Sequence, residues 1–134
     1  MMASESPDIL IVEDEPAILT SLEFILQHAG WKTKSVTDGE AAINSVQVAP
    51  PKIVVLDLML PKRNGFEVLK VIRSQPATRE LPVLILTAKG QQQDKQTARE
   101  LGANDFVTKP YANTDVVEAV ANLIGLPPKI VPAS

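Results

Sequence analysis

Short runs of aliphatic and β-branched residues alternate five times with longer stretches in which apolar residues recur at helical spacing. This alternation predicts parallel strands joined by crossover helices, because neighbouring parallel strands can be connected only by a segment that crosses the sheet. The second run, with Lys32 and Lys34, alternates like an edge strand, whereas the first, third and fourth are nearly all apolar. The predicted strands are 8–12, 31–36, 52–57, 82–87 and 105–108. The sequence therefore predicts an α/β fold with a doubly wound parallel sheet.

The helical stretches carry start and stop signals. Pro16 suits the first turn of a helix that runs to residue 29, where Gly30 ends it. Thr37 and Glu40 have the spacing of a capping box for a second helix that runs to about residue 46. Further helices are predicted after Gly65, at about 91–101 with Gly102 as its stop, and at about 113–124.

The chain has the size of a single domain. Its 134 residues can bury a sizeable core without a disulfide or a structural metal. We expect a disordered N-terminus at 1–7, one domain at 8–125, and a Pro-rich tail or linker stub at 126–134. No output domain is expected within this chain.

Composition excludes several classes of function. The chain has no cysteine, which suits a reducing compartment, and it shows neither a signal peptide nor an apolar run near the ~20 residues of a membrane span. The net charge is −3 and the basic residues are scattered, which argues against direct nucleic-acid binding. We therefore expect a soluble, cytoplasmic protein with no membrane or nucleic-acid contact.

Chemically active side chains collect at the predicted strand ends. The carboxyl ends of parallel strands share one edge of the sheet, and doubly wound sheets bind their ligands there. Crowded carboxylates raise one another's pKa unless a cation neutralises them, and oxygen ligands in modest number favour Mg²⁺. The residues are Glu13, Asp14 and Glu15 after the first strand, Asp57 after the third, Thr87 after the fourth, and Lys109 after the fifth.

Asp57 is the unusual member of this set. It ends the apolar run IVVLD, and burying an ionised carboxylate without a partner costs several kcal/mol, on the order of 5. Lys109 offers a fixed positive charge and Thr87 a hydroxyl donor, so an incoming phosphoryl group would find its oxygens matched. Asp57 is then a plausible nucleophile that attacks phosphorus and forms an acyl phosphate.

Four segments together resemble a known family. They are ILIVEDEP (9–16), VVLDLMLPKRNGFEVL (54–69), LILTAKG (84–90) and LGANDFVTKPY (101–111). In this order and spacing they resemble the receiver domain of two-component response regulators, the CheY-like superfamily. The resemblance covers about residues 8–125.

The resemblance implies a fold and a reaction. The fold would be the (βα)5 flavodoxin-like one, with a five-stranded parallel sheet in the order 2-1-3-4-5. Asp57 would be phosphorylated by a sensor histidine kinase or a phosphotransfer protein, and Thr87 and Lys109 would grip the phosphoryl oxygens. The Lys109–Pro110 peptide is typically cis in relatives.

The resemblance also implies Mg²⁺ as the cofactor. Asp14 and Asp57 would ligate it directly, the acid at Glu13 would act through water, and the backbone carbonyl of Met59 would complete the protein ligands. Most relatives have Tyr where this chain has Phe106, a ring thought to swing inward as the threonine, here Thr87, moves. Because Phe has no hydroxyl to draw it toward water, we expect an inward bias of Phe106 before phosphorylation.

A receiver would act as a signalling switch and not as an enzyme in the usual sense. A downstream protein would bind the face formed by the helix at 91–101, the strand at 105–108 and the helix at 113–124. On the last helix, Val117 and Ala121 lie where charged residues are usual, so they are either ordinary surface aliphatics or part of this docking surface. We expect a monomer or a weak dimer.

Other functions are less consistent with the sequence. An aspartyl-phosphate hydrolase would need an acid two positions after its nucleophile, where this chain has Met59. A flavin-binding module would need phosphate donors in the acidic loop EDEPA (13–17). A receiver that only binds partners would not need the full set of acid, hydroxyl and lysine. Simpler roles are expected elsewhere: Glu15 as a helix-terminal acid, Pro61 and Gly65 in a shaped loop, His28 in solvent, and Trp31 and Phe66 in packing.

Overall fold

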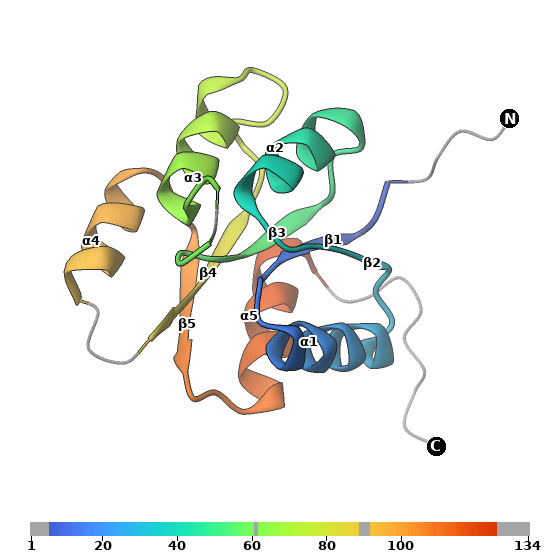
Figure 1. Cartoon of the computed structure of the whole chain (residues 1–134). Helices are drawn as coiled ribbons and strands as arrows, with labels where there is room; N and C mark the ends of the chain where they lie inside the picture. The colour runs from blue at the N-terminus through green and yellow to red at the C-terminus, as the bar shows by residue number, and fades with distance from the viewer. Residues whose placement is uncertain (1–5, 61, 89–91, 126–134) are drawn as a thin grey trace, which may run out of the picture.

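The computed structural model describes residues 6–60, 62–88 and 92–125. Within these residues, five parallel strands form one sheet in the order β2-β1-β3-β4-β5, and helices cover both of its faces (Figure 1). The strands are β1 (Ile9–Val12), β2 (Thr33–Val36), β3 (Ile53–Asp57), β4 (Val83–Ala88) and β5 (Asp105–Lys109). The helices are α1 (Pro16–Ala29), α2 (Gly39–Val48), α3 (Gly65–Ser74), α4 (Gln92–Glu100) and α5 (Asn113–Ile124). The predicted fold and strand order are confirmed.

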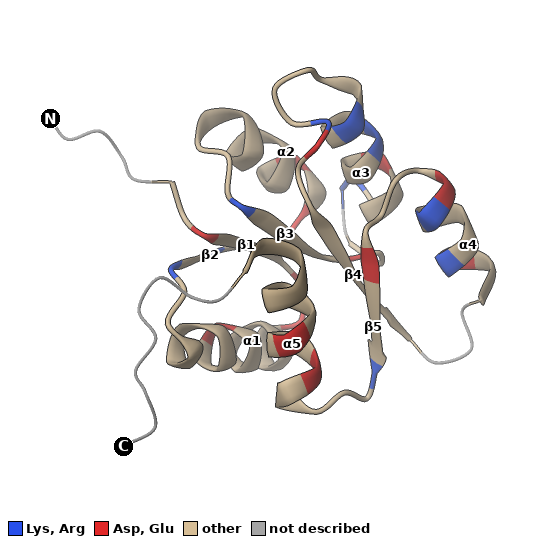
Figure 2. Cartoon of the chain, turned by 180° about the vertical axis from the view of Figure 1, so that it is seen from behind, with Lys and Arg blue, Asp and Glu red and all other residues tan. Residues whose placement is uncertain are grey.

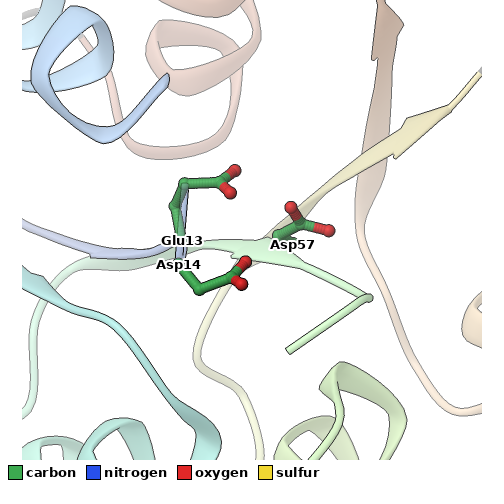
Figure 3. Close-up of side chains that lie close together, drawn as sticks. All are labelled: Glu13, Asp14 and Asp57. Atoms are coloured by element: carbon green, nitrogen blue, oxygen red, sulfur yellow. The ribbon is translucent and has the colours of Figure 1, made fainter. Parts of the chain in front are cut away.

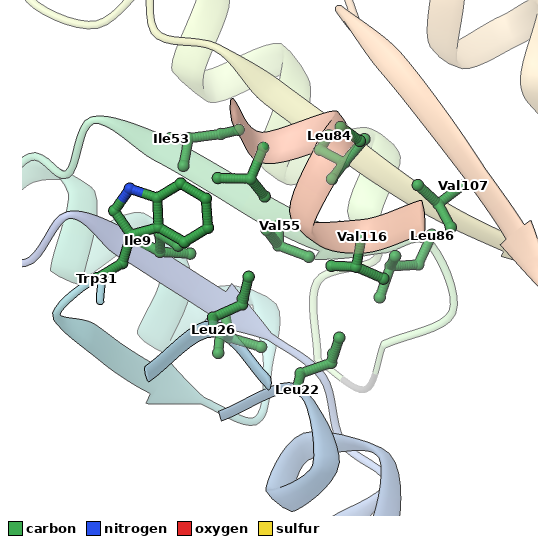
Figure 4. Packing of buried hydrophobic residues seen from close by; sticks show 13 residues of the cluster. Ile9, Leu22, Leu26, Trp31, Ile53, Val55, Leu84, Leu86, Val107 and Val116 are labelled. Atoms are coloured by element: carbon green, nitrogen blue, oxygen red, sulfur yellow. The ribbon is translucent and has the colours of Figure 1, made fainter. Parts of the chain in front are cut away.

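Alternate residues of the strands face two separate hydrophobic clusters. In β1, Ile9 and Ile11 point into the first cluster, with α1 and α5, while Leu10 and Val12 point into the second, with α2, α3 and α4. Figure 4 shows the first cluster, in which Trp31 packs over the strands as predicted. Burial of each large aliphatic side chain contributes about 1.5–3 kcal/mol, so these two clusters hold the strand ends in a fixed register.

The register aligns the strand ends that carry the predicted site. Val12 pairs with Leu56, so the residues after β1 lie beside Asp57 at the end of β3. Asp57 pairs in turn with Leu86, and Ala88 pairs with Lys109. Residues from four segments of the chain therefore meet at one edge of the sheet.

Glycine ends two helices where the sequence predicted it. Gly30 follows α1 with φ 115°, and Gly102 follows α4 with φ 105°, a left-handed conformation that glycine adopts without steric cost. Pro16 stands at the start of α1, also as predicted.

The predicted start of the second helix was wrong. The cap of α2 is Asp38, whose carboxylate accepts a hydrogen bond of 2.8 Å from the Ala41 backbone N–H, and not Thr37. Both residue types cap helices well, but it is Asp38 that has the extended backbone of a cap residue, directly before the helix begins at Gly39. The helix also continues two residues past the expected end, to Val48.

Several predictions concern residues at the margins of the described chain. The predicted N-terminal segment 1–7 is described only at residues 6 and 7, and the predicted tail at 126–134 lies outside the described residues, as does Pro61. His28 is exposed, as expected, and stacks on the Phe24 ring with centroids 5.8 Å apart. No helix in the described part of the chain has the length and apolar character needed to cross a membrane.

Candidate functional site

Three carboxylates meet at the carboxyl edge of the sheet. Glu13 and Asp14 follow β1, Asp57 ends β3, and one oxygen of each lies within 4.8 Å of the others. Figure 3 shows the three side chains close together at the strand ends, with those of Glu13 and Asp14 extending to the side on which Asp57 lies. Glu13 is 1% exposed and Asp57 6%, while Asp14 is exposed. The sheet therefore gathers an acidic cluster that is buried on one side and open to solvent on the other.

Both oxygens of Asp57 have a partner in the described chain. The Met59 backbone N–H donates to Oδ1 at 3.0 Å, and the Lys109 ammonium group donates to Oδ2 at 3.3 Å. These contacts offset the cost of burying the charge and fix the orientation of the carboxylate. Asp57 thus holds the turn after β3 through the Met59 N–H two residues on, and it also contacts a cation from β5.

Lys109 contacts two of the three acids. Its ammonium nitrogen lies 3.7 Å from Glu13 Oε1 as well as 3.3 Å from Asp57 Oδ2, and its side chain remains 28% exposed. The Lys109–Pro110 peptide is cis, as the resemblance implies.

Glu13 shows how strongly the carboxylates interact. Its pKa is raised from 4.5 to about 7, first by burial and then by the neighbouring Asp57, while the Glu15 N–H and Lys109 act in the opposite direction. Glu13 Oε1 is buried and makes no hydrogen bond with the described residues. The pKa of the Tyr111 hydroxyl is also raised, first by burial and then by the charges of Glu13 and Asp57.

The donor set of this cluster fits a divalent cation. It offers hard carboxylate oxygens, one of them without a hydrogen-bond partner among the described residues, and the ammonium group of Lys109 contacts two of the three acids. Mg²⁺ prefers such oxygen ligands together with retained water, which the exposed side of the cluster allows. A bound cation would also offset the charge of Asp57, which adds to the effect of burial in raising the pKa of Glu13.

Thr87 lies at the same edge, at the end of β4. It is 2% exposed, and its hydroxyl lies 3.5 Å from the hydroxyl of Thr108, where either group can donate. Thr108 was not among the sequence-predicted site residues, although it stands opposite Thr87 in the register of β4 and β5. Parallel pairing of the two predicted strands is the signal that could have found it.

Phe106 lies partly buried on β5 and packs against the second hydrophobic cluster. Two cations of α4 stand over its ring, Lys95 at 5.5 Å and Arg99 at 5.0 Å from the ring centroid. The expected inward bias of this ring stays a prediction. The α4 cations are a feature that sequence reasoning missed, since their contact requires the placement of α4 against β5.

The loop after β3 was predicted only in outline. The Met59 side chain is 65% exposed and its N–H binds Asp57, while the role of its carbonyl as a metal ligand stays a prediction. Asn64 and Glu67 form a complete capping box at the start of α3, which their spacing alone could have indicated.

Comparisons with known proteins agree with this geometry. The model of the response regulator receiver domain matches residues 9–121. The chain belongs to this family. Receiver domains act as signalling switches and interact with histidine kinases and downstream partners.

The chain is also similar to characterised members of the family. It is 42% identical over 108 residues to the alkaline phosphatase synthesis transcriptional regulatory protein PhoP of Bacillus subtilis, a match that covers 81% of this chain and 44% of that protein. The chain therefore spans less than half the length of this curated relative.

Two solved structures are similar along nearly their whole length. A response regulator structure from Chloroflexus aurantiacus superposes with a TM-score of 0.85 at 32% identity, covering 90% of this chain and 98% of that one. The receiver domain of sensor histidine kinase PA1611 from Pseudomonas aeruginosa superposes with a TM-score of 0.83 at 30% identity and the same coverage. That structure holds a magnesium ion in its active site cleft.

Proposed function

We propose that this receiver domain is a phospho-acceptor switch in which Asp57 receives a phosphoryl group from a histidine kinase or a phosphotransfer protein. The observation that carries the proposal is the setting of Asp57: a buried carboxylate with one oxygen on the Met59 N–H and the other on Lys109, beside two further acids. This arrangement orients a nucleophile and leaves its acidic neighbours free to bind a cation.

The transfer is balanced without water. An oxygen of Asp57 attacks the phosphorus of a phosphohistidine, the bond from phosphorus to the imidazole nitrogen breaks, and that nitrogen leaves with the electron pair. The product is an acyl phosphate on Asp57. Lys109 binds the phosphoryl oxygens and exchanges its contact with the free carboxylate for one with the phosphoryl group.

Mg²⁺ would be held by Asp14 and Asp57, by Glu13 through water, and by the Met59 carbonyl. Once bound, it neutralises the acidic cluster and the negative charge of the phosphoryl oxygens. The residues of this chain orient the nucleophile through Met59 N–H and keep one side of the site dry through the burial of Glu13 and Thr87.

The phosphoryl group would shift an equilibrium between two conformations. It adds close to two negative charges, which attract the Thr87 hydroxyl and Lys109, and a move of Thr87 opens space toward Phe106 on the adjacent strand. We propose that the face formed by α4, β5 and α5 changes with them and binds a downstream protein.

The surface of this face favours a partner with basic groups beside α5. A hollow of about 420 Å³ between β5 and α5 is bordered by polar residues: Asp105, Thr108, Asp115, Glu118 and Asn122. Figure 2 shows acidic residues on α5 and both basic and acidic residues on α4, with β5 between the two helices. Val117, in contrast, lines a separate groove between α1 and α5 and packs partly against the first cluster.

Intact mass spectrometry after treatment with acetyl phosphate and Mg²⁺ tests the reaction. The native chain should gain one phosphoryl group, and both Asp57→Ala and the native chain in chelator should gain none. Asp115→Asn, an exposed acid outside the site, serves as the control and should be modified like the native chain. A native chain that stays unmodified, or a gain that persists in Asp57→Ala, would refute the proposal.

A further inference from the structure

The segment 62–64, between β3 and α3, lies tightly against the first turn of α2. Gly39 is buried there, and a Cβ atom built on it would lie 1.8 Å from the Arg63 carbonyl oxygen and 2.6 Å from Arg63 Cβ. Contacts this short do not occur in folded proteins, so any residue with a side chain at position 39 must displace the backbone of the segment. Gly39 is therefore required by close approach and not by its backbone angles.

Two ion pairs join the same segment to the same helical turn. Lys62 Nζ lies 3.6 Å from Asp38 Oδ2, and Arg63 Nη1 lies 3.4 Å from Glu40 Oε2. Exposed pairs of this kind contribute only about 0.2–1 kcal/mol each, but here they act on a backbone that Gly39 already contacts. Lys62 has φ 68°, a left-handed conformation that a lysine adopts only where its surroundings hold it.

Asp38 has a second task in this turn. Its carboxylate caps α2 by accepting from the Ala41 N–H at 2.8 Å, and this bond is the first cause of its lowered pKa, with Lys62 contributing further. The start of α2 and the position of Lys62 therefore depend on one side chain.

The chain after this segment is hydrogen-bonded back to the end of β3. The Gly65 N–H donates to the Leu58 carbonyl at 2.9 Å, and a Cβ atom on Gly65 would lie 2.6 Å from Leu58 Cα and 2.8 Å from the Asp57 carbonyl oxygen. Met59 directly follows Leu58, and its N–H donates to Asp57 Oδ1. Arg63 lies four positions after Met59 in the sequence, so a displaced Arg63 backbone would act along the chain on the group that orients Asp57.

We propose that the first turn of α2, residues 38–40, is a positioning element for the acceptor site: it holds the 62–64 segment and thereby sets the Met59 amide and carbonyl against Asp57. The inference rests on the proposed function, because it concerns the group that orients the acceptor and the carbonyl expected to ligate the metal. Neither Gly39 nor Arg63 contacts the reacting atoms.

The test compares Gly39→Ala with Ala42→Gly, one turn further along α2. Ala42 is buried in the second cluster, so its replacement by glycine weakens the helix and its packing. In the metal-free, unphosphorylated chain, Gly39→Ala should shift the Met59 amide signal in ¹H–¹⁵N NMR spectra. Calorimetric titration with Mg²⁺ alone should show a dissociation constant raised about tenfold or more, the usual effect of losing an outer-shell support. Ala42→Gly should lower stability and change neither readout.

Charge reversal provides a second test that does not depend on the folding of Gly39→Ala. Arg63→Glu should shift the Met59 amide signal and raise the Mg²⁺ dissociation constant about twofold to fivefold, since it breaks one exposed pair and adds a repulsion. Combining it with Glu40→Arg restores the pair and should restore both readouts. Unchanged readouts in Gly39→Ala and Arg63→Glu, equal changes in Ala42→Gly, or a failure of the double variant to recover would overturn the inference.

The outcome is distinguishable from that of the proposed function. Both readouts are taken without a phosphoryl donor, so they decide the positioning role whether or not Asp57 is phosphorylated. A chain that binds Mg²⁺ but never gains a phosphoryl group would refute the switch and leave the role of α2 to be decided by the Met59 signal.

Discussion

At the scale of single residues, burial and the neighbouring Asp57 strongly raise the pKa of Glu13. Its pKa rises from 4.5 to about 7 because the ionised form is buried beside Asp57. In the folded protein it therefore binds a proton at pH values where the unfolded chain has already lost it. The free energy of unfolding therefore falls as the pH rises from about 4.5 to about 7. Above that range the loss is complete and amounts to about 3 kcal/mol at most.

Glu13→Gln removes the buried charge and should therefore stabilise the folded chain at high pH more than at low pH. In chelator, urea unfolding at pH 8 should give a higher free energy of unfolding for the variant than for the native chain, by about 1–3 kcal/mol. At pH 5 the difference should be smaller, because native Glu13 is then largely protonated. A variant that is destabilised equally at both pH values would contradict the raised pKa of Glu13.

At the scale of elements, α4 is the helix least anchored by apolar contacts. Among its described residues only Ala98 is buried, and the rest of the helix is polar. The cations Lys95 and Arg99, one turn apart, stand over the Phe106 ring at 5.5 and 5.0 Å and add a link between α4 and β5. Movement of the Phe106 ring would therefore change the contacts between β5 and α4.

A double-mutant cycle should detect this link. Arg99→Gln, Phe106→Leu and the double variant, measured by urea unfolding, should give a coupling free energy of about 0.5–1 kcal/mol, the usual size for a cation over an aromatic face at the surface. The same cycle with Arg79→Gln, an exposed arginine outside α4, should give none. Equal coupling for Arg79 and Arg99 would remove the cation–π contact as the cause.

At the scale of the whole molecule, the proposed metal binding would be linked to folding through the acidic cluster. A ligand that binds only the folded chain stabilises it by about 2.7 kcal/mol at one hundred times its dissociation constant. The cluster unites residues from β1 and β3, so an unfolded chain cannot reproduce it.

Mg²⁺ should therefore raise the melting temperature of the native chain in a concentration-dependent way. Thermal unfolding of Asp14→Ala should show no such rise, and neither should Asp57→Ala. Na⁺ at matched ionic strength is the control for general screening, and a rise of the same size with Na⁺ would contradict a specific site.

The positions of Asp57, Thr87 and Lys109 could be predicted from the sequence for a physical reason. Each follows or ends an apolar run, and parallel strands bring such ends to one edge whatever the details of packing. The acids after the first run belong to the same pattern, so the cluster of Glu13, Asp14 and Asp57 followed from the order of the elements.

Other features depended on the exact placement of segments that are distant along the chain. Both Thr37 and Asp38 are good cap residues, and which one begins α2 is settled by the backbone path after β2. The contact of Gly39 with Arg63 and the cations over Phe106 likewise join residues from different elements.

The sequence by itself thus determined the α/β architecture, the edge at which the site forms and the chemical groups that compose it, because hydrophobic periodicity and strand ends are local properties of the chain. Only the tertiary structure decided how those groups are oriented: the partners of Asp57, the raised pKa of Glu13 and the hold of α2 on the 62–64 segment. These arise from distances of a few ångströms between separate elements, which local patterns do not specify.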